Sequence, residues 1–258
     1  MENNNVKQTI SVIIPALNEE DNIESAILTT LAALDYYKID GEIIVVNDGS
    51  TDRTIEITKT LARTEHRIKL INHGHPLGIG ASFLEGVQLS QCDIVTMQPG
   101  DNENDPFEIL CYFELLKYVD IVVPFVYNTN VRNPLRNFLS SLFRSIINLT
   151  FQTNFNYTNG TVIYRRILLS DSKYKSTGFF FQAEILIKAV KKGYLFAEVP
   201  YRLQKRKFGK SKAIPLSSFI YVAGGYLQLI REIYFSRNDE YNIPLHKDSI
   251  SAERRSRS

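Results

Sequence analysis

The sequence of 258 residues contains no tryptophan, only two cysteines and no long apolar run. Cys92 and Cys111 lack the paired spacing of a zinc site or a disulfide framework, so the sequence fits a protein of the reducing cytoplasm. The longest apolar run, residues 219–230, is shorter than the roughly 20 residues that a membrane-spanning helix needs. Residues 1–8 are polar and do not resemble a signal peptide. We therefore predict neither a transmembrane segment nor export.

Net charge is also small, at +2, which does not indicate a nucleic-acid partner. Hydrophobic residues make up 44% and charged residues 22%, as in an ordinary globular protein. The length suits one α/β domain, which we place at residues 1–235. Residues 236–258 mix both charge signs with few large apolar groups, and we expect them to form a disordered tail.

Short β-branched runs alternate with helical patterns along most of the chain, as in a mostly parallel sheet with helices on both faces. The predicted strands are 10–14, 42–46, 68–71, 94–97, 120–125, 161–164 and 195–199. The predicted helices are 19–34, 52–64, 81–91, 135–151, 179–192 and 216–235. Ligands of such sheets bind beyond the carboxyl ends of the strands, where this chain has polar loops.

The predicted helix 135–151 is strongly amphipathic. Such a helix commonly packs its apolar side on the domain core. It can also lie in the membrane interface, with its arginines at the level of the lipid headgroups. The pattern alone favours neither interpretation.

Carboxylates stand in two of the polar loops. Asp48 follows an apolar strand and precedes Gly49, so it can accept hydrogen bonds from a ribose or a base; the alternative role is to cap the next helix. The loop 15–19, one strand earlier, favours a shared nucleotide pocket. Asp101 and Glu103 lie in the acidic loop 99–106 and are natural ligands for Mg²⁺ or Mn²⁺, although an acidic surface turn has the same composition.

Five cationic side chains gather in the segment 205–212. They can neutralise a departing diphosphate or meet an acceptor phosphate, and Arg206 is the best candidate for phosphate contact. A basic run is otherwise a solvated surface.

Seven stretches in this order resemble glycosyltransferase family 2, specifically the dolichyl-phosphate mannose synthase and bacterial polyprenyl-phosphate branch. The stretches are 11–20, 45–52, 78–81, 159–160, 182–184, 198–200 and 206–212. The resemblance implies a GT-A fold, inverting transfer and a divalent cation, Mg²⁺ or Mn²⁺, held by an Asp-x-Asp loop. The first aspartate of that motif aligns with Pro99, a form that resembles a bacterial subgroup, so metal use is an open expectation.

Carried over by position, the resemblance assigns nucleotide binding to Pro15, Asn18, Glu19 and Asp48, metal binding to Asp101 and Glu103, and the loop that closes on the diphosphate to Arg206 and Ser211. We also predict that Leu17, Gly78 and Gly100 contact the nucleotide and that Asp101, Arg206 and Ser211 form the catalytic group. The predicted acceptor or phosphate contacts are Arg132, Arg136, Lys205 and Lys212.

The expected partners are a UDP- or GDP-linked sugar and a polyprenyl phosphate at the inner membrane face, where the enzyme would be peripheral on helices 135–151 and 216–235. A phosphate acceptor is already anionic, so it needs no general base near the turn 156–160. Two alternatives are transfer to a soluble glycan or protein hydroxyl, and nucleotide-sugar binding without turnover. The sequence leaves a homo-oligomer open.

Overall fold

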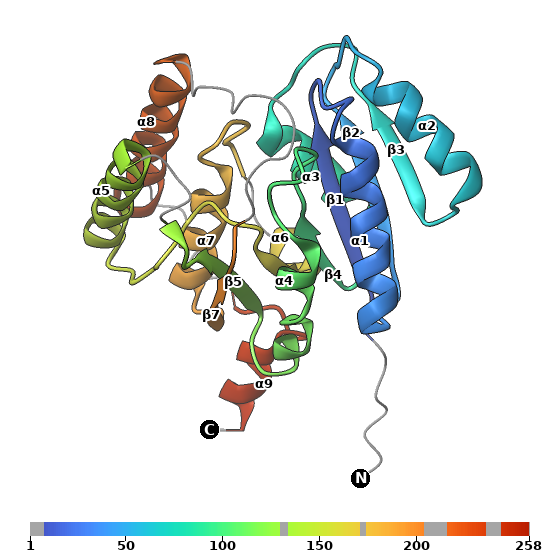
Figure 1. The fold of residues 1–258 in the computed structure, drawn as a ribbon. Helices are drawn as coiled ribbons and strands as arrows, with labels where there is room; N and C mark the ends of the chain where they lie inside the picture. The colour runs from blue at the N-terminus through green and yellow to red at the C-terminus, as the bar shows by residue number, and fades with distance from the viewer. Residues whose placement is uncertain (1–7, 130–133, 171–173, 204–215, 236–243, 258) are drawn as a thin grey trace.

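The protein folds around one seven-stranded sheet with the strand order β3-β2-β1-β4-β6-β5-β7 (Figure 1). The computed structural model describes residues 8–129, 134–170, 174–203, 216–235 and 244–257, with the backbone alone at residues 136 and 216–219. The strands are β1 (Ile10–Ala16), β2 (Gly41–Asn47), β3 (Ile68–Asn72), β4 (Ile94–Met97), β5 (Ile121–Val126), β6 (Ile163–Arg165) and β7 (Phe196–Tyr201). All neighbouring pairs are parallel except those of β6, which runs antiparallel to β4 and β5.

The helices follow the predicted alternation with the strands. They are α1 (Ile23–Tyr37), α2 (Thr54–Thr64), α3 (Ile79–Leu89), α4 (Pro106–Leu110), α5 (Pro134–Phe151), α6 (Arg166–Ser170), α7 (Phe181–Lys192), α8 (Leu216–Ile230) and α9 (Ile250–Ser256), with a short 3-10 helix η1 (Phe113–Lys117) and a π-helical turn η3 (Arg231–Phe235) after α8. The predicted helices and strands are confirmed within a few residues. The short elements α4, η1 and α6 were not predicted.

Side chains that point alternately to the two faces of the sheet divide the core into two layers. Ile43 and Val45 of β2 pack with α1 and α4 on one face, whereas Ile44 and Val46 pack with α3 and α7 on the other. Successive side chains of a strand point to opposite faces, so a continuous apolar run such as β2 buries both. The sheet is therefore covered on both sides, as the sequence predicts.

The helices α5 and α8 lie side by side at the edge of the molecule away from α1 (Figure 1). The rings of Phe151 and Tyr226 meet at 5.9 Å, and the hydroxyl groups of Thr150 and Tyr226 are hydrogen-bonded at 2.7 Å. The Tyr234 hydroxyl in η3 donates to the Thr150 carbonyl at 2.6 Å. These contacts join the two helices into one structural unit.

The expectation of a disordered tail is wrong for residues 244–257, while residues 236–243 lie outside the described residues. The Asp120 carboxylate, which is fully buried, accepts hydrogen bonds from the backbone N–H groups of Ile250 at 2.8 Å and Ser251 at 3.0 Å. A carboxylate at a helix N-terminus satisfies donors that have no partner within the helix. The pairing fixes α9 beneath β5, where it lies near the C-terminus (Figure 1). Within the described ranges, no helix is both long and apolar enough to cross a membrane.

Candidate active site

The carboxyl end of β1 is the centre of the candidate site, because loops on both sides are hydrogen-bonded to it. The Asp48 N–H, after β2, donates to the Ala16 carbonyl at 2.8 Å, and the Gly100 N–H, after β4, donates to the Pro15 carbonyl at 3.1 Å. A Cβ on Gly100 would lie 3.1 Å from the Ala16 side chain. The three predicted positions Pro15, Asp48 and Gly100 therefore meet at one edge of the sheet.

The loop after β1 is held against the loop after β2. Asn18 has a left-handed backbone, with a φ of 54°, and its side-chain oxygen accepts the Thr51 N–H at 2.8 Å. In the other direction the Asn18 N–H donates to the Ser50 hydroxyl at 2.9 Å. Glu19 is almost fully buried; its N–H donates to the Thr54 hydroxyl, and its carboxylate accepts from the Asn22 amide at 3.0 Å. Leu17 is flanked by Ala16 at the end of β1 and by Asn18, so the hydrogen bonds of Asn18 and Glu19 also fix the backbone position of Leu17.

Asp48 binds the protein's own backbone rather than pointing into open space. Its carboxylate accepts hydrogen bonds from the N–H groups of Leu77 at 2.8 Å and Gly78 at 2.9 Å. Burial alone would raise the pKa of Asp48, but these two bonds and the neighbouring His73 outweigh burial and lower it. Asp48 therefore stays ionised and organises the loop that follows β3. The sequence predicted its location and the presence of hydrogen-bond donors, but not that the donors belong to the chain.

His73 is a site residue that the sequence reasoning missed. It is buried between two carboxylates, with its Nδ1 atom 2.8 Å from Asp48 Oδ1 and its Nε2 atom 2.7 Å from Glu85 Oε2. Burial would lower the pKa of His73, but the hydrogen bonds to both acids raise it overall. The available signal was a histidine directly after a strand end that faces the ligand edge.

The amino end of α3 is closed by another loop. The Thr177 carbonyl accepts the Gly80 N–H at 2.7 Å and the Ala81 N–H at 3.3 Å. A Cβ on Gly78, whose φ is 102°, would lie 2.7 Å from the same carbonyl, so the close approach requires glycine. The first N–H groups of α3 are thus used within the chain, and Gly78 contributes through shape rather than as a free donor.

The acidic loop after β4 is tied to the end of β7. Asn104 pairs with Leu203 in an isolated antiparallel bridge, and its side-chain oxygen accepts the Tyr201 hydroxyl at 2.9 Å. The buried Gln98 amide donates to the Asn104 carbonyl. The bridge therefore places Leu203, the last described residue of this stretch, beside the acidic loop.

Asp101 and Glu103 have donor chemistry that fits a divalent cation. Both are partly exposed oxygen ligands, and the Glu103 N–H donates to Asp101 Oδ1 at 3.1 Å in a tight turn with Asn102 at a φ of 55°. Mg²⁺ commonly takes one or two carboxylates and completes its shell with phosphate oxygens and water. In the part of the chain that the structure describes, no group of three or more acidic, histidine or cysteine side chains is arranged around a metal position. Pro99 offers only a carbonyl, which accepts the Asn102 N–H at 3.3 Å.

Five of the predicted residues, Arg206, Ser211, Lys205, Lys212 and Arg132, lie outside the described residues. Arg136 lies in the first turn of α5, and only its backbone is described. Their roles stay predictions.

The turn 156–160 is hydrogen-bonded to Glu198, an acidic residue of β7. Both oxygens of Glu198 accept hydrogen bonds from Asn156, at 2.6 Å from its backbone N–H and 2.7 Å from its amide. Arg144 of α5 donates to the Asn156 carbonyl at 3.1 Å. Glu198 therefore holds the turn in place and connects it to α5.

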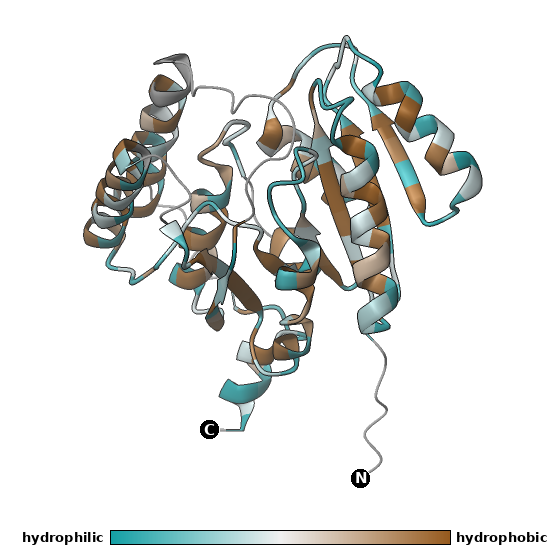
Figure 2. Cartoon of the chain, viewed as in Figure 1, coloured by the Kyte–Doolittle hydropathy of each residue, from teal (hydrophilic) through white to brown (hydrophobic). Residues whose placement is uncertain are grey.

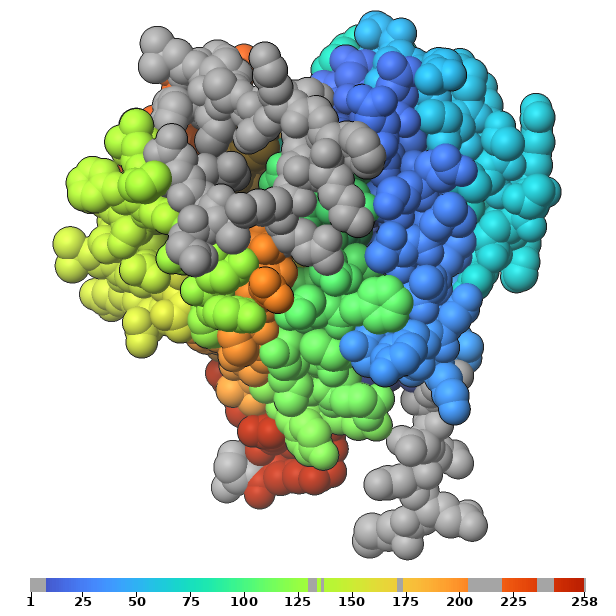
Figure 3. All heavy atoms as spheres, viewed as in Figure 1, coloured from blue at the N-terminus to red at the C-terminus, as the bar shows by residue number. Residues whose placement is uncertain are grey.

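The helix α5 has apolar residues on two sides, and packing on the core, the first of the two interpretations, accounts for one of them. The membrane interpretation stays a prediction. Ile147 and Phe151 are buried in the core, and Phe143 meets the Phe180 ring at 6.3 Å. The other side carries an exposed stripe in which Leu135, Phe138, Leu139, Leu142, Ile146 and Leu149 expose 41–84% of their surface. The segment of α5 lies along an outer edge of the molecule in the space-filling view (Figure 3), and the apolar colour of α5 and α8 is visible in Figure 2. We call these six residues the α5 stripe.

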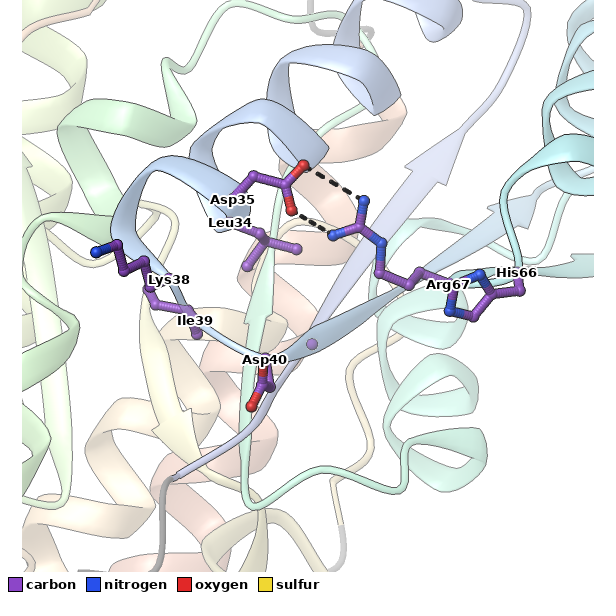
Figure 4. A pocket seen from close by; sticks show the side chains of 8 residues that line it. Leu34, Asp35, Lys38, Ile39, Asp40, His66 and Arg67 are labelled. Carbon is purple, nitrogen blue, oxygen red and sulfur yellow. Dashed lines mark hydrogen bonds and ion pairs between the residues drawn. The ribbon is translucent and has the colours of Figure 1, made fainter.

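A pocket lies at the opposite edge of the sheet. It is lined by residues from the end of α1 to the start of β2 and by His66 and Arg67 before β3 (Figure 4). Arg67 is paired there with Asp35 at 2.6 Å and with Glu65 at 2.9 Å. These charges already neutralise one another, and the pocket is at the amino ends of the strands, so it does not contribute to the candidate site.

A sequence profile described as Glycosyl transferase family 2 matches residues 11–172, more than half of the chain. The chain therefore belongs to glycosyl transferase family 2. The family resemblance predicted from the motifs is confirmed at this level.

Relatives with curated descriptions match a shorter region. An uncharacterized glycosyltransferase of Synechocystis sp. is 33% identical over 97 residues, which cover 38% of this chain and 30% of the relative. An undecaprenyl-phosphate 4-deoxy-4-formamido-L-arabinose transferase of Edwardsiella ictaluri is 33% identical over 103 residues, covering 40% of this chain and 32% of the relative. The chain thus spans about a third of the length of the curated relatives that it matches.

Solved structures extend the likeness to most of the chain. Glucosyl-3-phosphoglycerate synthase from Mycobacterium tuberculosis, in complex with Mn²⁺, UDP and phosphoglyceric acid, has a TM-score of 0.66 at 20% identity and covers 86% of this chain and 78% of its own. Its complex with phosphoglyceric acid has a TM-score of 0.67 at 20% identity, with coverage of 92% and 81%. The predicted GT-A fold is confirmed.

Proposed function

We propose that this chain transfers a sugar from a nucleoside diphosphate to the phosphate of a polyprenyl lipid at the surface of the cytoplasmic membrane. The transfer inverts the anomeric carbon, because the acceptor oxygen attacks from the face opposite the departing diphosphate. The observation that carries the choice of a lipid is the exposed α5 stripe beside α8, since a protein that meets only water rarely exposes a large contiguous apolar patch.

The donor is assigned to the edge where β1, β2 and β4 end. Pro15, Asn18 and the loop after Asp48 surround one side, and the acidic loop with Asp101 surrounds the other. Open α/β sheets bind nucleotides in this crevice. The UDP bound by the structural relatives supports a nucleotide here, and either a UDP- or a GDP-linked sugar fits the proposal.

A divalent cation would be held by Asp101 and Glu103. When bound, it supplies positive charge to the diphosphate and so stabilises its departure. The chain itself supplies the second source of positive charge from the segment that starts at Leu203, with Arg206, Lys205 and Lys212 as phosphate contacts and Ser211 as a hydrogen-bond donor. Mn²⁺ and Mg²⁺ in complexes of the structural relatives are consistent with this assignment.

The acceptor phosphate needs no base to remove a proton, because it is ionised at neutral pH. This agrees with the surroundings of the turn 156–160, where both Glu198 oxygens are engaged by Asn156. Arg132 and Arg136 are assigned to the acceptor phosphate. The lipid chain would then run along the α5 stripe.

The test is an incubation of purified protein with Mn²⁺, a panel of UDP- and GDP-linked radiolabelled sugars, and undecaprenyl phosphate in detergent or vesicles. We expect the label to move into the organic phase only with the lipid phosphate present. Undecaprenol is the matched control acceptor, because it has the same chain without the phosphate and should accept no sugar.

Two further outcomes would contradict the proposal. Transfer to 3-phosphoglycerate or to a glycan in the absence of lipid would identify a soluble acceptor. Nucleotide binding without transfer to any acceptor would identify a binding protein without turnover.

A further inference from the structure

His73 stands between the donor site and the body of the protein, and the proposed function gives it no role. Its imidazole ring comes from the end of β3 and touches one carboxylate from β2 and one from α3. The two acids differ in exposure: the Asp48 side chain is 6% exposed, whereas Glu85 is 44% exposed. The buried acid, Asp48, is the one that accepts hydrogen bonds from the backbone of Leu77 and Gly78.

The protonation state of His73 follows from its neighbours. An ionised carboxylate accepts hydrogen bonds and donates none, so both ring nitrogens must carry a proton to satisfy Asp48 and Glu85 together. The ring in this arrangement is an imidazolium ion. A neutral ring would turn a lone pair toward one of the carboxylates and would lose the charge that strengthens the bond to the other.

Asp48 connects the His73 ring to the backbone of the loop that follows β3. Its Oδ1 atom is shared between His73 and the Leu77 N–H, each at 2.8 Å, and its Oδ2 atom accepts the Gly78 N–H at 2.9 Å. The backbone N–H of His73 also donates to the Asn47 carbonyl at 2.9 Å, which fixes the start of the same loop. The Asp48 carboxylate therefore holds the segment 73–78 at both ends: at His73 through the ring, and at Leu77 and Gly78 through their backbone N–H groups.

We propose that His73, as an imidazolium ion between Asp48 and Glu85, is a positioning residue that holds the 73–78 loop in the conformation that binds the nucleotide. This inference rests on the proposed function, because it assumes that the nucleotide lies at this edge of the sheet. It also makes donor binding depend on pH. Of the charged side chains in the described residues, Asp48 and Glu85 are the ones that the structure pairs with the ring.

The direction of the pH effect follows from the charge. Burial would lower the pKa of His73, but the hydrogen bonds that the ring donates to both acids outweigh it and raise the pKa above its ordinary value, so the imidazolium form persists to a higher pH than in an exposed histidine. Nucleotide affinity should therefore be full at acidic pH and fall as the ring loses its proton. Because a neutral ring can keep one bond to Asp48 while Glu85 turns to solvent, we expect a severalfold loss rather than a complete one.

The experiment compares UDP and GDP binding, with Mn²⁺, by calorimetry from pH 5.5 to 9 for wild type, H73Q, E85Q and E56Q. Glu56 is an exposed carboxylate on α2, so E56Q is the matched control for the loss of one negative charge. Affinities are expressed relative to H73Q at each pH, which cancels the titration of the nucleotide and the metal and leaves the contribution of the His73 ring. The His73 ring is followed by NMR in the same samples, with H73Q identifying its signal.

We expect H73Q to bind about tenfold more weakly than wild type at pH 6, because one charge-assisted buried hydrogen bond is lost, and to show no histidine-dependent change with pH. E85Q should lose affinity at a lower pH than wild type does, and the NMR titration of His73 should move with it. E56Q should follow wild type throughout.

Equal affinity of H73Q and wild type at acidic pH would overturn the inference, as would an E85Q profile that coincides with that of E56Q. If wild type binds neither nucleotide at any pH, the proposed function fails and the inference fails with it. A folded H73Q with normal binding removes the inference alone. If H73Q does not fold, the exposed position of Glu85 leaves E85Q as the deciding variant.

Discussion

The α5 stripe provides a quantitative test of membrane attachment. Phe138, Leu142 and Leu149 lie on one side of the helix and expose 65%, 48% and 84% of their surface, whereas Ile147 and Phe151 on the other side are buried. We propose replacing the three exposed residues by serine. The buried side and its core contacts remain, so the fold should change little, with a free energy of unfolding within about 0.5 kcal/mol of wild type.

The magnitude follows from the exposed area. Full burial of a leucine or phenylalanine side chain is worth about 1.5–3 kcal/mol, so three side chains that are about two-thirds exposed contribute about 3–6 kcal/mol when they enter a bilayer. Since 1.4 kcal/mol corresponds to a factor of about ten, the triple variant should bind vesicles about two to four orders of magnitude more weakly. The assay is co-sedimentation with vesicles of phosphatidylcholine and phosphatidylglycerol.

The control places the same change elsewhere on the surface. Leu28 on α1, Leu89 at the end of α3 and Tyr118 expose 47%, 44% and 61% of their surface, and serine at these three positions removes a similar apolar area. We expect this control to bind vesicles as wild type does. Equal loss in both triple variants, or no loss in the α5 variant, would refute the assignment of the α5 stripe to the membrane.

Three other substitutions test separate parts of the account. Asp101→Ala should reduce turnover by about 10³-fold or more at any Mn²⁺ concentration while the melting temperature stays the same, because a metal ligand is lost; activity that returns at high Mn²⁺ would argue against that role. Arg206→Ala should lower the rate of transfer more than nucleotide binding, measured by single-turnover kinetics and calorimetry, since its loop is expected to tighten only on the loaded site; an equal effect on both would contradict this. Lys188→Met should lower the free energy of unfolding by about 3–5 kcal/mol in urea, because Lys188 is 1% exposed and its Nζ atom neutralises the buried Glu184 at 3.0 Å and Glu232 at 2.6 Å. Lys59→Met on the exposed face of α2 is its control, and a similar small effect of both would show that the buried cluster is not needed for stability.

Much of the fold could be predicted because the signals are local. The strand β4 was predicted with its observed bounds, since Ile94–Met97 is a short apolar run bounded by polar residues. The antiparallel direction of β6 was not predicted, because nothing in the pattern of Ile163–Arg165 records the direction of its neighbours. The prediction of a disordered tail was wrong for a similar reason: α9 depends on Asp120, which lies 130 residues before Ile250 in the chain.

The candidate site was predicted in location but only partly in chemistry. Strand ends bring Pro15, Asp48 and Gly100 together, and this follows from the parallel order of β1, β2 and β4. The partners of Asp48 could not be read from the sequence, because the hydrogen bonds from Leu77 and Gly78 depend on the path of a loop. His73 was missed because a lone histidine in a loop has many roles until its neighbours are known.

The most direct test of the central claim is the balance of the products formed from a nucleotide sugar and undecaprenyl phosphate. One molecule of nucleoside diphosphate should be released for each sugar found by mass spectrometry on the lipid phosphate, and the Asp101→Ala variant should produce neither. Release of nucleoside diphosphate without any sugar on the lipid, by a protein that binds the donor normally, would contradict the account.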